Sequence, residues 1–255
     1  MDERLTAPPG QEHLPPTSGI VTGGSGDEGA ASSDALGGLD DPRALQILST
    51  EHWSLLSQRS LVYNEAFARA GMFLTFLSAS LVALAFVASA MSFSHEFLVL
   101  AALLLFVDTA IGLATIGRML DASVDDLRSI AGMNRIRNAY LRIAPGVAPF
   151  FSAGIHDDVA GVLDTYGTAR IRSGLPAFVH GLTTAGGMIM TIDSLLTAAL
   201  AGIVALFLGA DMLGAFAAGA VGFLAMFAAL NRYAYGVVSG FESSFASRFP
   251  TPPEG

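Results

Sequence analysis

The sequence contains neither cysteine nor lysine, and only 14% of its 255 residues carry a charge. The absence of cysteine excludes disulfide bonds, thiolate metal sites and cysteine nucleophiles. A glycine-rich phosphate-binding loop, a Walker pattern and a serine nucleophile elbow are missing too. We therefore expect no enzymatic activity and no cofactor, and the sequence gives no reason to assign a catalytic residue or a metal ligand.

Long apolar runs dominate the rest of the chain, of which 52% is hydrophobic, with a mean hydropathy of +0.55. A helix of about 20 apolar residues crosses the hydrocarbon core of a bilayer. The runs do not alternate in polarity as the strands of a membrane β-barrel do. We therefore predict an all-α integral membrane protein with four transmembrane helices, arranged as two hairpins: Gly71–Met91 with Phe97–Ile116, and Met188–Ala210 with Met212–Leu230.

The placement of arginine predicts how the chain is oriented. The two short tips, Ser92–Glu96 and Asp211, contain no arginine, whereas four arginines precede the first run, seven lie between the second and third, and two follow the fourth. Basic residues that flank membrane spans stay on the cytoplasmic side. We expect a multi-pass protein of the cell (plasma or inner) membrane, with both termini and the central segment in the cytoplasm.

The composition divides the chain into six segments. Residues 1–41 are acidic, rich in Gly and Pro and poor in aliphatic side chains, which is typical of disorder. Before the first hairpin and between the two hairpins we expect helices, because Asp41-Pro42 suits a helix start and Pro145-Gly146 suits a helix end. The predicted segments are a disordered tail (1–41), an amphipathic cytoplasmic helix leading into the first span (42–69), hairpin 1 (70–117), a cytoplasmic module of two or three short helices (118–187), hairpin 2 (188–235) and a short C-terminal tail (236–255).

Asp108 is the acidic residue closest to the middle of a predicted span. At 1.5 Å per residue it lies about 16 Å from the outer end and about 12 Å from the inner end of its run. Gly112 and Thr115 share its helix face. An ionisable residue inside the membrane is a candidate for function. Two roles remain open for Asp108, namely an ion or proton site and a hydrogen bond between helices.

Asp193 is expected closer to the cytoplasm, because it lies only about 8 Å along the helix axis from Met188. Arg69, Arg118 and Arg232 each lie within a few residues of a predicted inner boundary. We therefore predict an ion pair between Asp193 and one of these arginines at the inner interface.

Arg128, Arg135 and Arg142 recur every seven residues and so share one stripe of the helix predicted over Asp125–Ala144. Such a stripe suits anionic lipid headgroups, and it equally suits the acidic residues of a neighbouring cytoplasmic helix. Both interpretations remain open.

Small residues recur every four positions on the fourth run, at Gly214, Ala218 and Gly222. Such a face lets two helices approach closely. The partner helix lies either within the chain or in another subunit, so a homo-oligomer is a further hypothesis.

His156, Asp157 and Asp158, together with Asp164 and His180, are residue types that bind divalent metals. Their spacing matches no metal motif, and adjacent residues of a helix do not face each other. We expect helix capping and surface charge here, on a short helix at Asp157–Tyr166.

Two stretches carry a resemblance to known sequences. The first runs from Ile47–Leu56 through Asn64-Glu65-Ala66-Phe67 to Gly71-Met72-Phe73-Leu74, and the second combines Ala131-Gly132-Met133-Asn134-Arg135-Ile136-Arg137 with His156-Asp157-Asp158. They resemble an uncharacterised family of bacterial integral membrane proteins over residues 43–235. The resemblance implies the four-helix architecture and brings no activity, cofactor or site.

These features favour a non-enzymatic membrane interaction or scaffold module whose cytoplasmic helices bind lipid headgroups or a protein partner. The alternative is a small oligomeric channel or a proton- or ion-coupled transporter that uses Asp108. Nucleic acid is not an expected partner, because the chain has no strongly basic domain or stacking platform. No small-molecule ligand is indicated.

Overall fold

The computed structural model describes residues 37–91, 93–167 and 181–252. Every regular element within these ranges is helical. Four of the helices are long and apolar enough to cross a membrane, which confirms the prediction of an all-helical chain with four candidate spans. The long helices are α2 (Ala44–Met91), α3 (His95–Ile143), α6 (Ala185–Phe207) and α7 (Met212–Ser244), and the short ones are η1 (Gly37–Asp40), η2 (Pro145–Phe150) and α4 (Val159–Thr165).

Polar side chains cap three of the long helices at their N-termini. Ser94 accepts a hydrogen bond from the backbone N–H of Phe97 at the start of α3, and Asp211 accepts one from Gly214 at the start of α7. Thr184 does the same for α6. Side-chain oxygens at this position satisfy backbone donors that the helix itself leaves free. The caps of α3 and α7 lie in the short tips expected from the sequence.

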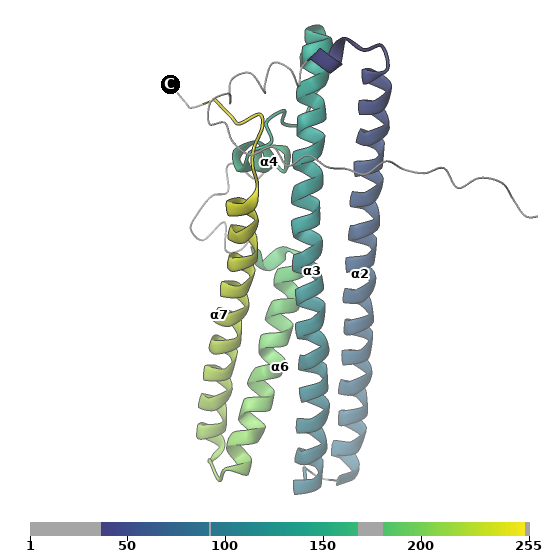
Figure 1. Ribbon diagram of the computed structural model, residues 1–255. Coiled ribbons are helices and arrows are strands. Elements are labelled where there is room, and N and C mark those ends of the chain that lie inside the picture. Colours follow the sequence, from purple (N-terminus) through teal and green to yellow (C-terminus); the bar gives the residue numbers. More distant parts are fainter. Residues whose placement is uncertain (1–36, 92, 168–180, 253–255) are drawn as a thin grey trace, which may run out of the picture. The chain divides into compact units, whose positions relative to one another are not determined.

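α3 is the central element of the unit that begins at Leu39. α2 packs along one side of α3 and α6 along another, and α7 packs along α6 and also contacts α3 (Figure 1). The core between the long helices contains Phe73, Leu105, Ile116, Ile189 and Leu196. Any side chain on the faces of α3 that meet α2 and α6 is therefore enclosed by neighbouring helices.

α2 and α3 are much longer than a membrane span. They contain 48 and 49 residues, or about 72 Å each at 1.5 Å per residue, against about 30 Å for a bilayer core. The boundaries drawn at 69/70 and 117/118 thus fall inside continuous helices. The first helix of the expected module is the far part of α3, which ends at Ile143, just before Pro145-Gly146 as expected.

A second core lies on this far part of α3. Ile130 and Met133 pack there with Val162 of α4, and Leu55 of α2 and Phe245 lie against them. The expected short helix is present as α4, with Asp158 as its N-cap. The last residues of the tail predicted over 1–41 form η1, whereas residues 1–36 lie outside the described residues, as do residues 168–180 of the predicted cytoplasmic module.

Glycine sets the spacing between α6 and α7. A Cβ built on Gly222 would lie 2.9 Å from the Cβ of Ala201, and one on Gly219 would lie 3.0 Å from the carbonyl oxygen of Ala198. Gly214 lies against Ala210 and Asp211 of its own tip instead, and Ala218 is half-buried. Close packing within the chain therefore uses one face of α7 that includes Gly222.

Candidate functional site

Two carboxyl groups are completely buried in the parts of α3 and α6 proposed to lie in the membrane. Asp108 and Asp193 have no exposed surface. Ser80 of α2 donates a hydrogen bond of 3.1 Å to Oδ1 of Asp108. Oδ2 of Asp108 and both carboxyl oxygens of Asp193 have no hydrogen-bond partner among the described residues. Three buried carboxyl oxygens without partners are unusual, because a buried polar atom normally has one.

Gly112 joins the two acids in space. A Cβ built on Gly112 would overlap Oδ1 of Asp193 and lie 2.9 Å from its Cγ, so the carboxyl group of Asp193 occupies the space beside this glycine. Gly112 comes one turn after Asp108, or about 6 Å along α3. The Phe73 ring of α2 closes the same space at 3.3 Å. The carboxyl group of Asp193 on α6 therefore lies beside α3, about one turn from Asp108.

The expected ion pair of Asp193 with an arginine is wrong. Arg69 and Arg118 both bind Glu65 of α2, with N···O distances of 3.0 and 3.2 Å. Arg232 is exposed on α7. The reason is that α6 begins at Ala185, before Met188, and turns Asp193 inward onto Gly112, while the arginines stay on the exposed side.

Hydroxyl groups near the two acids mostly bind the backbone of their own helix. Thr115 donates to the carbonyl of Ile111, Ser194 to that of Met190, and Thr197 to that of Asp193. Such bonds satisfy the hydroxyl locally. Thr109, next to Asp108, differs because its buried Oγ1 has no partner among the described residues. Ser80 differs as well, because its hydroxyl donates to the carboxyl group of Asp108 itself.

The arginine stripe largely binds groups within the chain. Arg128 forms an ion pair with Asp125 at 3.1 Å, and Arg142 donates to Asn138. Arg135 binds Asp157 and donates to the carbonyl of Ala246. Neither contact is with a residue of a neighbouring helix, because Asp125 lies on α3 itself and Asp157 precedes α4.

Asp157 holds the segment that follows α7. Its buried carboxylate accepts hydrogen bonds from the Ser247 hydroxyl at 2.6 Å and from the backbone N–H groups of Arg248 and Phe249 at 2.9 and 2.7 Å. Burial alone would raise the pKa of Asp157, but these bonds and Arg135 together hold that pKa below its usual range. The expectation of surface charge was wrong for Asp157, whereas helix capping is confirmed at Asp158.

Asp126 is the centre of a second polar cluster that the sequence did not reveal. Arg59 of α2 pairs with this buried carboxylate, and Tyr63 and Tyr166 donate their hydroxyl protons to it. Burial, followed by the hydrogen bond and the negative charge of Asp126, raises the pKa of Tyr166. The cluster ties α2, α3 and the end of α4 together.

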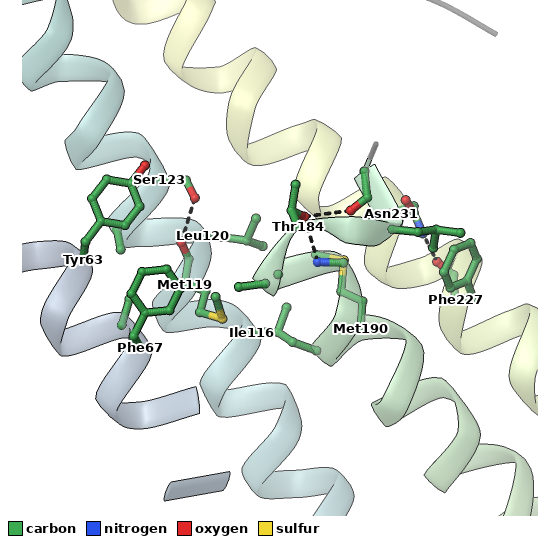
Figure 2. A pocket seen from close by; sticks show the side chains of 17 residues that line it. Tyr63, Phe67, Ile116, Met119, Leu120, Ser123, Thr184, Met190, Phe227 and Asn231 are labelled. Atoms are coloured by element: carbon green, nitrogen blue, oxygen red, sulfur yellow. Dashed lines mark hydrogen bonds between the residues drawn. The ribbon is translucent and has the colours of Figure 1, made fainter. Parts of the chain in front are cut away.

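A cavity of about 490 Å³ lies between the four long helices, close to the start of α6 (Figure 2). Ile116 lines it one turn of α3 from Gly112, and Met190 lines it one turn of α6 from Asp193.

In the described part of the chain, no group of three or more His, Asp or Glu residues is arranged to hold a metal ion.

Comparisons of the chain with protein-family models, with curated proteins and with solved structures found no match. The resemblance drawn from the sequence therefore gains no support from them. The proposed function rests on the geometry of the buried acids.

Proposed function

We propose that the chain is an integral membrane protein in which α2 with α3, and α6 with α7, form two transmembrane hairpins. Both termini and the far parts of α2 and α3 lie in the cytoplasm. Four apolar helices of sufficient length support insertion, and the absence of arginine from the two tips supports this orientation. The far parts of α2 and α3, with α4, form the cytoplasmic module.

Within this membrane protein, Asp108 and Asp193 carry protons across the bilayer. The observation that supports this function is the burial of both carboxyl groups on facing helices, with three of four oxygens lacking a partner. A bare carboxylate in an apolar interior is costly, so each group needs a bound proton or a cation. Intramembrane acids of this kind form proton relays in pumps and transporters.

Protons fit this site better than metal cations do. A dehydrated metal cation needs several oxygen ligands at once, whereas a proton needs one carboxyl oxygen. The carboxyl group of Asp193 is in close contact with Gly112 and lies near the ring of Phe73. Asp193 and Asp108 are therefore successive proton-binding positions, and Ser80 supports Asp108 by donating to it.

Proton flux into vesicles tests this function. The purified chain is reconstituted into liposomes that contain a pH-sensitive dye, a potassium gradient and valinomycin set the membrane potential, and the rate of acidification is measured. We expect flux from the wild type, and for Asp108→Asn and Asp193→Asn the rate of protein-free vesicles. Asp121→Asn, an exposed change on the same helix, should retain the wild-type rate.

A wild-type rate equal to that of empty vesicles would exclude proton transport. Flux of sodium or potassium without protons, lost in the same two variants, would assign the two acids to a metal cation instead. The orientation is tested separately with a periplasmic reporter enzyme inserted at Ser94, which should be active only if this tip is outside.

A scaffold function is the second candidate, and one surface favours it. Large apolar side chains on the N-terminal half of α2 are between 40% and 69% exposed, although this half lies beyond the proposed span: Leu45, Ile47, Trp53, Leu56 and Leu61. Exposed apolar surface in water marks interaction sites. A protein partner or a second copy of the chain would bind here, and native mass spectrometry of the protein in nanodiscs would detect a homo-oligomer.

A further inference from the structure

The cavity near the start of α6 is apolar at one end and polar at the other (Figure 2). Its walls come from α2, α3, α7, the first turns of α6 and the residues just before α6. Apolar side chains make up most of the lining: Phe67, Ile116, Met119, Leu120, Met190 and Phe227. Its volume of about 490 Å³ is within the range of pockets that bind small apolar ligands.

On three of the helices, a polar residue of the lining lies one turn from an apolar residue of the lining. Tyr63 comes one turn before Phe67 on α2, Ser123 one turn after Met119 on α3, and Asn231 one turn after Phe227 on α7. In each case the polar residue lies toward the end of the helix proposed to be cytoplasmic. Thr184, the N-cap of α6, lies at the same end (Figure 2).

Three polar side chains at this cavity already donate hydrogen bonds within the protein. Ser123 donates its proton to the carbonyl of Met119, Asn231 donates to that of Phe227, and Tyr63 donates to Asp126. A buried water needs two to four polar partners, and cavities lined by apolar side chains stay dry. An amphiphile with one apolar chain satisfies both ends of the cavity.

We propose that this cavity binds one acyl chain of a phospholipid from the cytoplasmic leaflet. The chain end lies against Ile116 and Met190, and the ester region lies beside Ser123, Thr184 and Asn231. The cavity lies beside the start of α6, at the depth at which the proposed spans start, which is the depth of the cytoplasmic leaflet. Because the polar residues are uncharged, the acyl chain and not the headgroup charge determines binding.

The site is separate from the proton positions. Neither Asp108 nor Asp193 lines the cavity. The proposal depends on membrane insertion, but it does not depend on proton transport. A failure of the flux experiment would leave it unaffected, and a failure here would leave the proton proposal unaffected.

Photochemical cross-linking in wild-type protein tests the proposed depth. The chain is reconstituted in dioleoylphosphatidylcholine vesicles with a trace of phosphatidylcholine that carries a diazirine either at the end of one acyl chain or beside its carbonyl. Peptide mass spectrometry then locates the labelled residues. We expect the chain-end probe to label Ile116 and Met190, and the carbonyl probe to label Ser123 and Asn231. Labelling confined to the outer surfaces of the helices would overturn the proposal.

A pair of glycine variants provides the matched control. Gly186 lines the cavity, and a Cβ built on it meets no atom within 4 Å, so Gly186→Leu places its side chain in free space beside the cavity. Gly117 has the same free space but does not line the cavity. We expect Gly186→Leu to lower cavity labelling about tenfold, and Gly117→Leu to leave it unchanged. Equal labelling in both variants would also overturn the proposal.

Discussion

The carboxyl group of Asp193 on α6 lies in the space left by the absent side chain of Gly112 on α3. This contact fixes where α6 crosses α3 and places Asp193 within about one helical turn of the position of Asp108 along α3. It also explains why Asp193 pairs with none of the nearby arginines. The relation of these two residues is the basis of the proposed proton path.

Replacing Gly112 by alanine should destabilise the protein. The new methyl group would overlap Asp193 and approach Phe73, and overpacking of a closed core costs about 1–3 kcal/mol. Thermal unfolding in detergent, followed by circular dichroism, measures the change. Gly117→Ala is the control, because a Cβ there meets nothing within 4 Å and alanine favours a helix over glycine. Equal melting temperatures for the two variants would contradict the contact.

Asp157→Asn should release the segment that follows α7. An amide cannot replace the ionised carboxylate toward Arg135, the Ser247 hydroxyl and two backbone N–H groups, and a buried donor left unpaired costs about 1–3 kcal/mol. Hydrogen exchange of the amides of Arg248 and Phe249 should therefore become faster. Asp164→Asn, an exposed change on α4, should leave it unaltered. Unchanged protection in Asp157→Asn would show that other contacts hold the segment.

The same segment should detach at low pH. Because the folded state lowers the pKa of Asp157, its carboxylate stabilises docking above the unfolded value of about 4, and this stabilisation is lost as the pH falls through the lower folded value. The chain has no cysteine, so Ala246→Cys allows one spin label to be attached beside the docked segment. The label should be immobilised at neutral pH and mobile in strong acid. A label equally immobile throughout would exclude Asp157 as the anchor.

Arg59→Met should destabilise the cytoplasmic end of the helices. It leaves the buried Asp126 with two tyrosine donors and no cation, at a cost of about 1–3 kcal/mol. Chemical denaturation should show the loss. Arg43→Met removes an exposed ion pair with Asp41 and should have little effect. If the two variants lose similar stability, the Asp126 cluster is not a structural anchor.

Helix type, the number of apolar spans and several helix ends could be predicted from the sequence. These features depend on the length and apolar content of each run, which can be read from the run itself. The caps at Ser94 and Asp211 lie at the predicted tips. The continuity of α3 from His95 to Ile143 was not predicted, because the polar residues after Arg118 suggest a new segment although none of them stops a helix. A helix that passes from the membrane into water changes its amino-acid composition there, but it does not have to end.

Sequence reasoning identified Asp108 with Gly112 and placed Asp193 closer to the cytoplasm, but it paired Asp193 with an arginine instead of Gly112. Depth along one helix can be counted, whereas which side chains meet between two helices depends on how their surfaces pack, here through Gly112. The clusters at Asp126 and Asp157 were missed for the same reason. Arg59 gave the available signal, because it lies between the apolar residues Leu55 and Val62 of α2, where a carboxylate on the facing helix is a suitable partner.

Infrared difference spectroscopy shows directly whether Asp108 and Asp193 exchange protons with water from within the bilayer. Spectra of the reconstituted protein are recorded between two bulk pH values, with aspartate labelled by carbon-13 to identify its bands. We expect carboxyl bands that respond to the change in pH and that disappear one at a time in Asp108→Asn and Asp193→Asn. Difference spectra identical in the wild type and both variants would contradict the proposed proton transport, because carboxyl groups that exchange no protons cannot carry them.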